Sequence, residues 1–131
     1  EQKVEFISAG FGYSRDPSLL TVYALIKDEN DIDYVRGEID QVLETYRTTL
    51  CDPKRLDDLK RKSKYSFLMD LDSSDNVAAE TSELIALTGS FDTIDALYEN
   101  LQKITPEDIR SAANRYFTPE KKNTIVVKGA K

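Results

Sequence analysis

Hydrophobic and polar positions near the start of the chain form a pattern that predicts a β-hairpin. Residues 4–13 carry spaced apolar and aromatic side chains, and residues 19–27 are apolar, aromatic or β-branched on both faces of a strand. Between them, residues 14–18 combine serine, aspartate and proline, which are residue types of tight turns. We therefore expect two strands joined by a turn, with residues 19–27 forming a central strand that is covered on at least one side.

The pattern then changes to a helical period. Apolar residues recur at steps of three and four over residues 35–50, which predicts a helix that begins at Asp31 or Asp33 and covers the sheet. Gly89 is expected to end a later helix. Further helices are expected to begin at Asp52, at Ser74 or Asp75, at Phe91 and at Thr105. Each start is marked by a capping side chain, by proline at the first helical position or by a new apolar stripe.

The last helix and the end of the chain carry the clearest local signals. Residues 105–108 read Thr-Pro-Glu-Asp, a capping box with proline at the first helical position, and Pro119 stops the helix that follows. The β-branched run in residues 123–128 predicts a closing strand. The sequence thus predicts one α+β domain over residues 1–131, with an antiparallel or mixed sheet of about three strands covered on one face by about five helices.

Charge and hydropathy exclude several classes of partner. The chain has 18 lysines and arginines against 24 aspartates and glutamates, a net charge of −6, which argues against nucleic acid. No apolar run is long enough to predict a membrane span, and no signal-peptide pattern follows the first residue. Because that residue is Glu1 and not methionine, we expect the chain to be a segment excised from a longer protein.

The absence of histidine is the most informative feature of the composition. With no histidine, a histidine-based zinc site, a Ser-His-Asp triad and a histidine general base are excluded within this chain. Cys51 is the only cysteine, so no internal disulfide forms, and we interpret it as a filler between two helices. Asp70, Asp72 and Asp75 are the best candidates for a hard cation, but they lack the glycine and distal glutamate of a calcium loop. We interpret them as a solvated turn and a helix cap, and we assign no catalytic or metal-binding residue.

The order and spacing of these segments resemble the C-terminal half of a domain of pitrilysin/insulinase-family zinc metallopeptidases. The resemblance covers nearly the whole chain, and no single motif in it is diagnostic. Its residues are 15–17 before the strand at 19–27, Leu56 with the stretch 60–72, then 85–89, 104–109, 112–117 and 123–127. Bacterial members with a similar Tyr-Ser-Phe-Leu-Met-Asp segment look closest.

The resemblance implies a ferredoxin-like, pitrilysin-type layout in a chain of repeated α+β domains that close around an unfolded peptide. In that family the first domain carries an inverted His-x-x-Glu-His motif that holds zinc and activates water. This chain has no such motif, so zinc is expected in the N-terminal domain of the parent and no cofactor in this segment. The parent would be a zinc metalloendopeptidase, and this segment a non-catalytic, substrate-enclosing domain that is inactive alone. Bacterial cytoplasm and periplasm both stay open as its location.

The implied partners are other domains or a partner subunit of the same peptidase, with a peptide as substrate of the parent. Tyr13, Arg15 and Asp16 at the hairpin are candidate peptide contacts, with turn chemistry and a surface ion pair as the alternative. We interpret Tyr65 and Tyr116 as core residues on helices. The basic run of the second helix is interpreted as a solvated outer face, and consists of Arg55, Lys60, Arg61, Lys62 and Lys64.

Two other functions stay open from the sequence. The parent could be a non-peptidase core or assembly member of the same family, which only the presence or absence of the zinc motif elsewhere would decide. The chain could also be an unrelated α+β interaction module that forms a homodimer through an open sheet edge.

Overall fold

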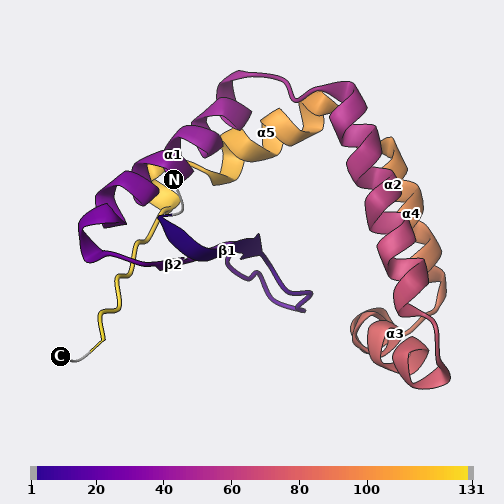
Figure 1. The fold of residues 1–131 in the computed structure, drawn as a ribbon. Helices are drawn as coiled ribbons and strands as arrows, with labels where there is room; N and C mark the ends of the chain where they lie inside the picture. Colours follow the sequence, from indigo (N-terminus) through magenta and orange to yellow (C-terminus); the bar gives the residue numbers. More distant parts are fainter. Residues whose placement is uncertain (1–2, 130–131) are drawn as a thin grey trace.

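The computed structural model describes residues 3–129 and has an α+β fold with five α-helices and a two-stranded antiparallel sheet (Figure 1). The described chain begins with the strands β1 (Val4–Gly10) and β2 (Thr21–Ile26), and the short 3-10 helix η1 (Glu29–Asp31) follows them. The helices after them are α1 (Ile32–Thr48), α2 (Pro53–Asp70), α3 (Ser74–Thr88), α4 (Asp92–Lys103), α5 (Pro106–Tyr116) and the 3-10 helix η2 (Pro119–Lys121).

The helices form an arch with two packed pairs, and the hairpin lies beneath it (Figure 1). In one arm α1 packs against α5, and in the other α2 packs against α4, with α3 contacting both. Val35 of α1 is buried, and Ala113 of α5 is only 2% exposed, because its small side chain lets the two helices approach closely. The prediction that the first long helix covers the sheet is therefore wrong: the apolar stripe of α1 has α5 as its main packing partner.

The hairpin is shorter than predicted. β1 and β2 pair from Val4 with Ile26 to Gly10 with Thr21, with an irregularity between Val4 and Phe6. Glycines at positions 10 and 12 bring no side chain to pair across strands, so the ladder ends at Gly10 and a long loop, residues 11–20, replaces the predicted turn. No residue of either strand is fully buried: one face of β2, with Val22, Ala24 and Ile26, is half-buried, and the other face is exposed.

The predicted closing strand does not form. Residues 123–128, called the closing segment below, pair with no strand, so the sheet among residues 3–129 has two strands instead of the expected three. The segment is tied at its ends: Lys122 Nζ lies 2.6 Å from Asp40 Oδ2, and Lys128 Nζ lies 3.0 Å from Glu29 Oε2. These carboxylates hold it beside the first half of α1, and Ile125 and Val127 stay 86% and 89% exposed.

Local capping signals account for most helix boundaries. Asp52 accepts a hydrogen bond from the Lys54 amide ahead of proline at the first position of α2, and Gly89 ends α3 in a left-handed conformation with φ of 77°. The capping box of α5 is complete, with Thr105 and Asp108 each accepting from the other's backbone N–H. All three signals are confirmed.

Two helix starts differ from the predictions in how they are capped. Ser73, one residue before the predicted choices, accepts a hydrogen bond from the Asn76 amide at the start of α3. α1 follows Asp31 as expected, yet the Asp31 side chain does not cap the helix. Its carboxylate instead lies 2.6 Å from Lys3 Nζ.

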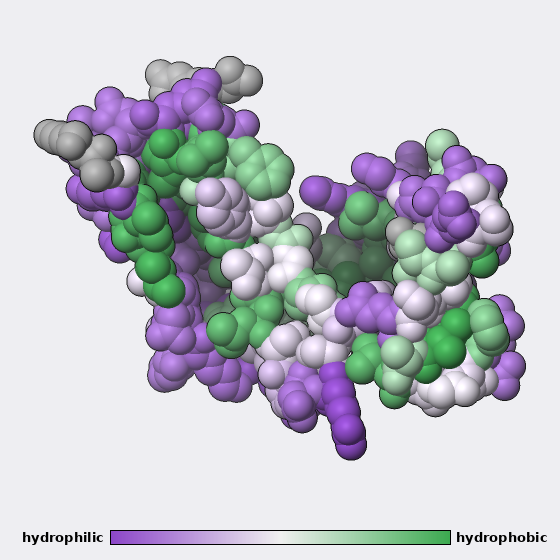
Figure 2. Space-filling model, turned by 90° about the horizontal axis from the view of Figure 1, so that it is seen from below, coloured by the Kyte–Doolittle hydropathy of each residue, from purple (hydrophilic) through white to green (hydrophobic). Residues whose placement is uncertain are grey.

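The apolar core of the described part of the chain is thin. Its buried apolar residues are Val35, Leu56, Leu84 and Ala113, and many large apolar side chains are exposed. Figure 2 shows hydrophobic residues spread over the surface on both sides of the hollow between the two arms. Within residues 3–129, no helix is both long and apolar enough to cross a membrane.

Candidate functional site

A groove lies between the loop of the hairpin and the helices of the second arm. Its volume is about 490 Å³. One wall is a single face of α2 made by Lys62, Ser63, Ser66, Phe67 and Asp70, which recur at steps of one and three and therefore share one side of the helix. We call it the α2–α4 groove.

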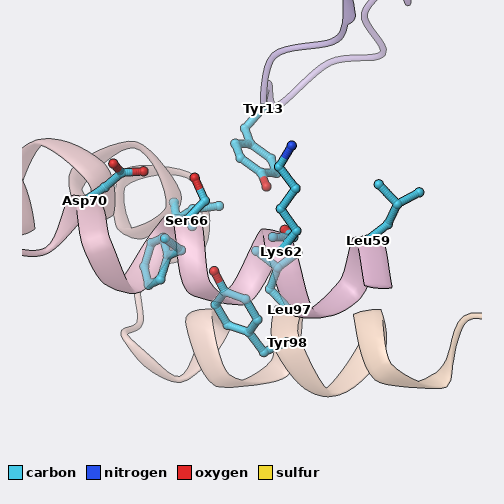
Figure 3. A pocket seen from close by; sticks show the side chains of 10 residues that line it. Tyr13, Leu59, Lys62, Ser66, Asp70, Leu97 and Tyr98 are labelled. Atoms are coloured by element: carbon cyan, nitrogen blue, oxygen red, sulfur yellow. The ribbon is translucent and has the colours of Figure 1, made fainter. Parts of the chain in front are cut away.

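The opposite side of the α2–α4 groove is formed by residues from three other elements. Tyr13 reaches in from the β1–β2 loop, Leu97 and Tyr98 come from α4, and Leu84 comes from α3. Figure 3 shows the Lys62 side chain extending from α2 alongside the Tyr13 ring, with Ser66 further along α2 and Tyr98 on the α4 side of the groove. The loop thus completes a site that the helices alone leave open.

Aromatic packing fixes the floor of the groove. The rings of Phe67 and Tyr98 are tilted by 50° with their centres 5.3 Å apart, a favourable geometry for an aromatic pair. Burial raises the pKa of the Tyr98 hydroxyl, and the nearby Tyr13 hydroxyl raises it further. Tyr98 therefore stays protonated at neutral pH and can donate a hydrogen bond.

The polar side chains of the α2–α4 groove have no partner within the described part of the chain. Residues 3–129 offer no hydrogen bond or salt bridge to the Lys62 ammonium, the Asp70 carboxylate or the hydroxyls of Tyr13, Ser66 and Tyr98. These five groups and Ser63 line a space with apolar walls from Leu59, Leu84 and Leu97. The groove is therefore lined by both polar and apolar side chains, with six polar residues among the ten.

Lys60 departs from the prediction for the basic run of α2. Its side chain is 7% exposed, and its ammonium donates to the carbonyls of Gln102 at 3.0 Å and Ile104 at 2.6 Å. These carbonyls lie at the C-terminal end of α4, where helix backbone acceptors lack partners inside the helix. Lys60 is therefore a structural bond between α2 and α4, whereas Lys62, half a turn further along, faces the groove.

A second, smaller cavity surrounds the cysteine. It has a volume of about 160 Å³ and lies between the last turn of α1 and the first turn of α2, lined among others by Tyr46, Cys51 and Arg55. Cys51 is a half-buried free thiol in the connection between these helices, the position predicted for it.

The structure separates the three candidate peptide contacts predicted at the hairpin. Tyr13 lines the α2–α4 groove, but Arg15 and Asp16 do not. The Asp16 carbonyl accepts a hydrogen bond from Ser14 Oγ at 2.6 Å, as expected of turn chemistry. Among the salt bridges within residues 3–129, none joins Arg15 to Asp16.

The two tyrosines predicted as core are both at the surface. Tyr65 is 65% exposed and Tyr116 is 56% exposed, so this prediction is wrong. The reason for Tyr116 is visible in its neighbours, because Arg115 and Lys121 place their cations 5.3 Å and 5.9 Å from its ring. Tyr65 lies on the side of α2 that faces away from α4.

The aspartates at the end of α2 do not converge on one point. Asp70 lines the groove, Asp72 accepts a hydrogen bond from Asn76 Nδ2 at 2.7 Å, and Asp75 lies in the first turn of α3. Within residues 3–129, no group of three or more histidine, cysteine, aspartate or glutamate side chains is placed to hold a metal ion.

Comparisons with known protein families, with curated proteins and with solved structures find no match for this chain.

Part of the α2–α4 groove is predictable from the sequence. Tyr13 is among the predicted peptide contacts, and Asp70 is among the candidate cation ligands. Lys62, Ser66 and Tyr98 are not predicted, because a lysine in a charged run and a tyrosine at helical spacing look the same from sequence whether or not a loop packs over them. The spacing of Ser63, Ser66 and Asp70, which leaves a polar strip beside an apolar one on α2, is the signal that marks this face.

Proposed function

We propose that this chain is a non-catalytic, substrate-enclosing domain of a zinc-dependent peptidase of the pitrilysin/insulinase type. The observation that carries the proposal is the unfinished sheet: two strands in which no residue is fully buried, and an apolar closing segment that forms no strand pair within residues 3–129. Such a surface is expected of a part that is completed by other parts of a larger protein.

The exposed side chains of the hairpin support this proposal. Phe6, Ile7, Tyr23 and Leu25 are all about half exposed although they are strand residues with large apolar side chains. Fully burying a side chain of this kind stabilises a protein by about 1.5–3 kcal/mol. Adding neighbouring strands and a helical layer over this sheet would therefore contribute several kcal/mol to assembly.

The closing segment has the composition of a further strand of the sheet. Its β-branched residues suit a strand, and Ile125 and Val127, two residues apart and both highly exposed, would share one face of such a strand. In the assembled peptidase we expect this segment to leave the side of α1 and to pair as a further strand of the sheet. The resulting domain would have the predicted layout of a multistranded sheet with helices on one face.

The absence of histidine limits what this domain contributes. It would supply surface and backbone hydrogen-bonding groups to an enclosed peptide, and the metal and the water-activating glutamate would come from another domain. The domain thus raises activity by binding and enclosing the substrate.

The test measures cleavage of an internally quenched fluorescent peptide with added Zn²⁺. The chain alone is expected to give no cleavage that a chelator abolishes, and the complete product of its gene, or the complex with its zinc-bearing partner, is expected to give such cleavage. In that assembly the double substitution Ile125→Lys and Val127→Lys should lower activity strongly, because it blocks strand pairing. The matched control Lys64→Met alters an exposed residue of α2 and should leave activity unchanged.

Two results would overturn the proposal. One is chelator-sensitive cleavage by the chain alone. The other is a complete gene product and partner set without any His-x-x-Glu-His motif, which would instead identify an assembly subunit.

A further inference from the structure

We propose that the α2–α4 groove binds a short extended stretch of peptide, with a peptide carboxylate held at Lys62 and a neighbouring apolar side chain packed on Phe67 and Leu97. The choice of a peptide as ligand rests on the proposed function. The position and polarity of the site rest on the groove itself.

The groups around Lys62 are hydrogen-bond donors. The ammonium carries three donors and lies alongside Tyr13 (Figure 3), and the hydroxyls of Tyr13, Ser66 and Tyr98 belong to side chains that line the same groove. None of them is used by residues 3–129. A carboxylate accepts several hydrogen bonds at once, and bonds from an ammonium to a carboxylate are among the stronger ones in proteins.

Asp70 makes the two ends of the groove differ in charge. It lies eight residues after Lys62 on the same helix, which corresponds to about 12 Å along the axis. A second carboxylate would be repelled at that end, while an amine or a basic side chain would be attracted. An extended peptide covers this distance with about three to four residues.

The apolar floor lies between the two charged ends. Phe67, Tyr98 and Leu97 meet there, next to Leu84 of α3, and the aromatic pair offers a rigid surface. A leucine or phenylalanine of the peptide next to its acidic group would fill this part. The predicted ligand is therefore a peptide with an apolar residue adjacent to a carboxylate and without negative charge a few residues before it.

The test is fluorescence anisotropy of the chain with a fluorescein-labelled peptide that carries leucine and phenylalanine before a C-terminal glutamate. Lys62→Met, which keeps the apolar stem and removes the charge, is expected to weaken binding about tenfold. Lys64→Met removes a lysine two residues away that does not line the groove, and it is expected to change affinity by less than about twofold. Because neither lysine is buried, both variants should keep the circular dichroism of the parent chain.

Two peptide controls separate the sources of the carboxylate. Replacing the glutamate by glutamine leaves only the terminal carboxylate, and amidation of the C-terminus leaves only the side chain. Loss of binding in one of these peptides assigns the carboxylate that Lys62 holds. Equal binding by Lys62→Met and Lys64→Met, no binding of the peptide at all, or an Asp70→Asn variant weakened as much as Lys62→Met would each overturn the inference.

The outcome is independent of whether the parent is a peptidase. A complete gene product without the zinc motif would remove the proposed function, while Lys62-dependent binding of the peptide would still establish the groove as a peptide site.

Discussion

Lys60→Met tests how much one buried ammonium contributes to joining α2 with α4. Each hydrogen bond from a charged donor is worth about 1.5–3 kcal/mol, so the two bonds to Gln102 and Ile104 set an upper limit of about 6 kcal/mol. Two effects reduce that value: methionine avoids the cost of desolvating an ammonium, and the carbonyls of Gln102 and Ile104 at the helix end can take up water. We therefore expect a loss of about 2 kcal/mol in the free energy of unfolding.

The assay is urea denaturation of the isolated chain followed by far-UV circular dichroism. Lys64→Met is the matched control, since it makes the same chemical change on the exposed side of the same helix and should alter stability by less than about 0.5 kcal/mol. If Lys60→Met and Lys64→Met unfold at the same urea concentration, Lys60 does not bond α2 to α4 and the described packing of this arm is wrong.

Three further predictions follow from other contacts. Backbone and side-chain hydrogen bonds from Thr105 lower the pKa of the Asp108 carboxyl. Its contribution to stability is therefore present above its ordinary pKa of 3.8 and is lost as the pH falls through the lower folded value. Asp108→Asn should make the free energy of unfolding depend less on pH in that range. Gly89→Ala should cost about 1 kcal/mol in thermal or urea unfolding, because φ is 77° there, and an unchanged midpoint would contradict the left-handed cap. Ile125→Lys with Val127→Lys should change the stability of the isolated chain by less than about 0.5 kcal/mol per site, since both side chains are exposed, and a larger loss would show that the closing segment is already packed.

The sequence predicted the features that depend on neighbouring residues. The capping box at Thr105, the Asp52–Pro53 start and the Gly89 end were all found, because each is built from side chains and backbone within one helical turn. The existence of five helices and of the hairpin followed from periodicity in the same way.

The features that depend on distant packing could not be predicted. Lys60 follows the buried Leu56 by four residues and so shares its helix face, but the carbonyls that bind its ammonium are more than forty residues away in the sequence and could not be predicted. Likewise, the β-branched residues of the closing segment indicate a strand, but strand formation needs a partner edge, and ion pairs with Asp40 and Glu29 hold the segment elsewhere. For the groove, Tyr13 becomes part of a site only because a long loop carries it to α2.

The closing segment is easy to detach, because the two ion pairs that hold its ends are weak. Both lie at the surface, and surface ion pairs of this kind contribute about 0–1 kcal/mol each and weaken as salt is added. Within residues 3–129, no backbone hydrogen bond fastens residues 123–129. The segment can therefore leave the side of α1 and pair with a strand at a small fraction of the cost in free energy of unfolding a helix. At high ionic strength it would be released first, while the α1–α5 pair stays intact.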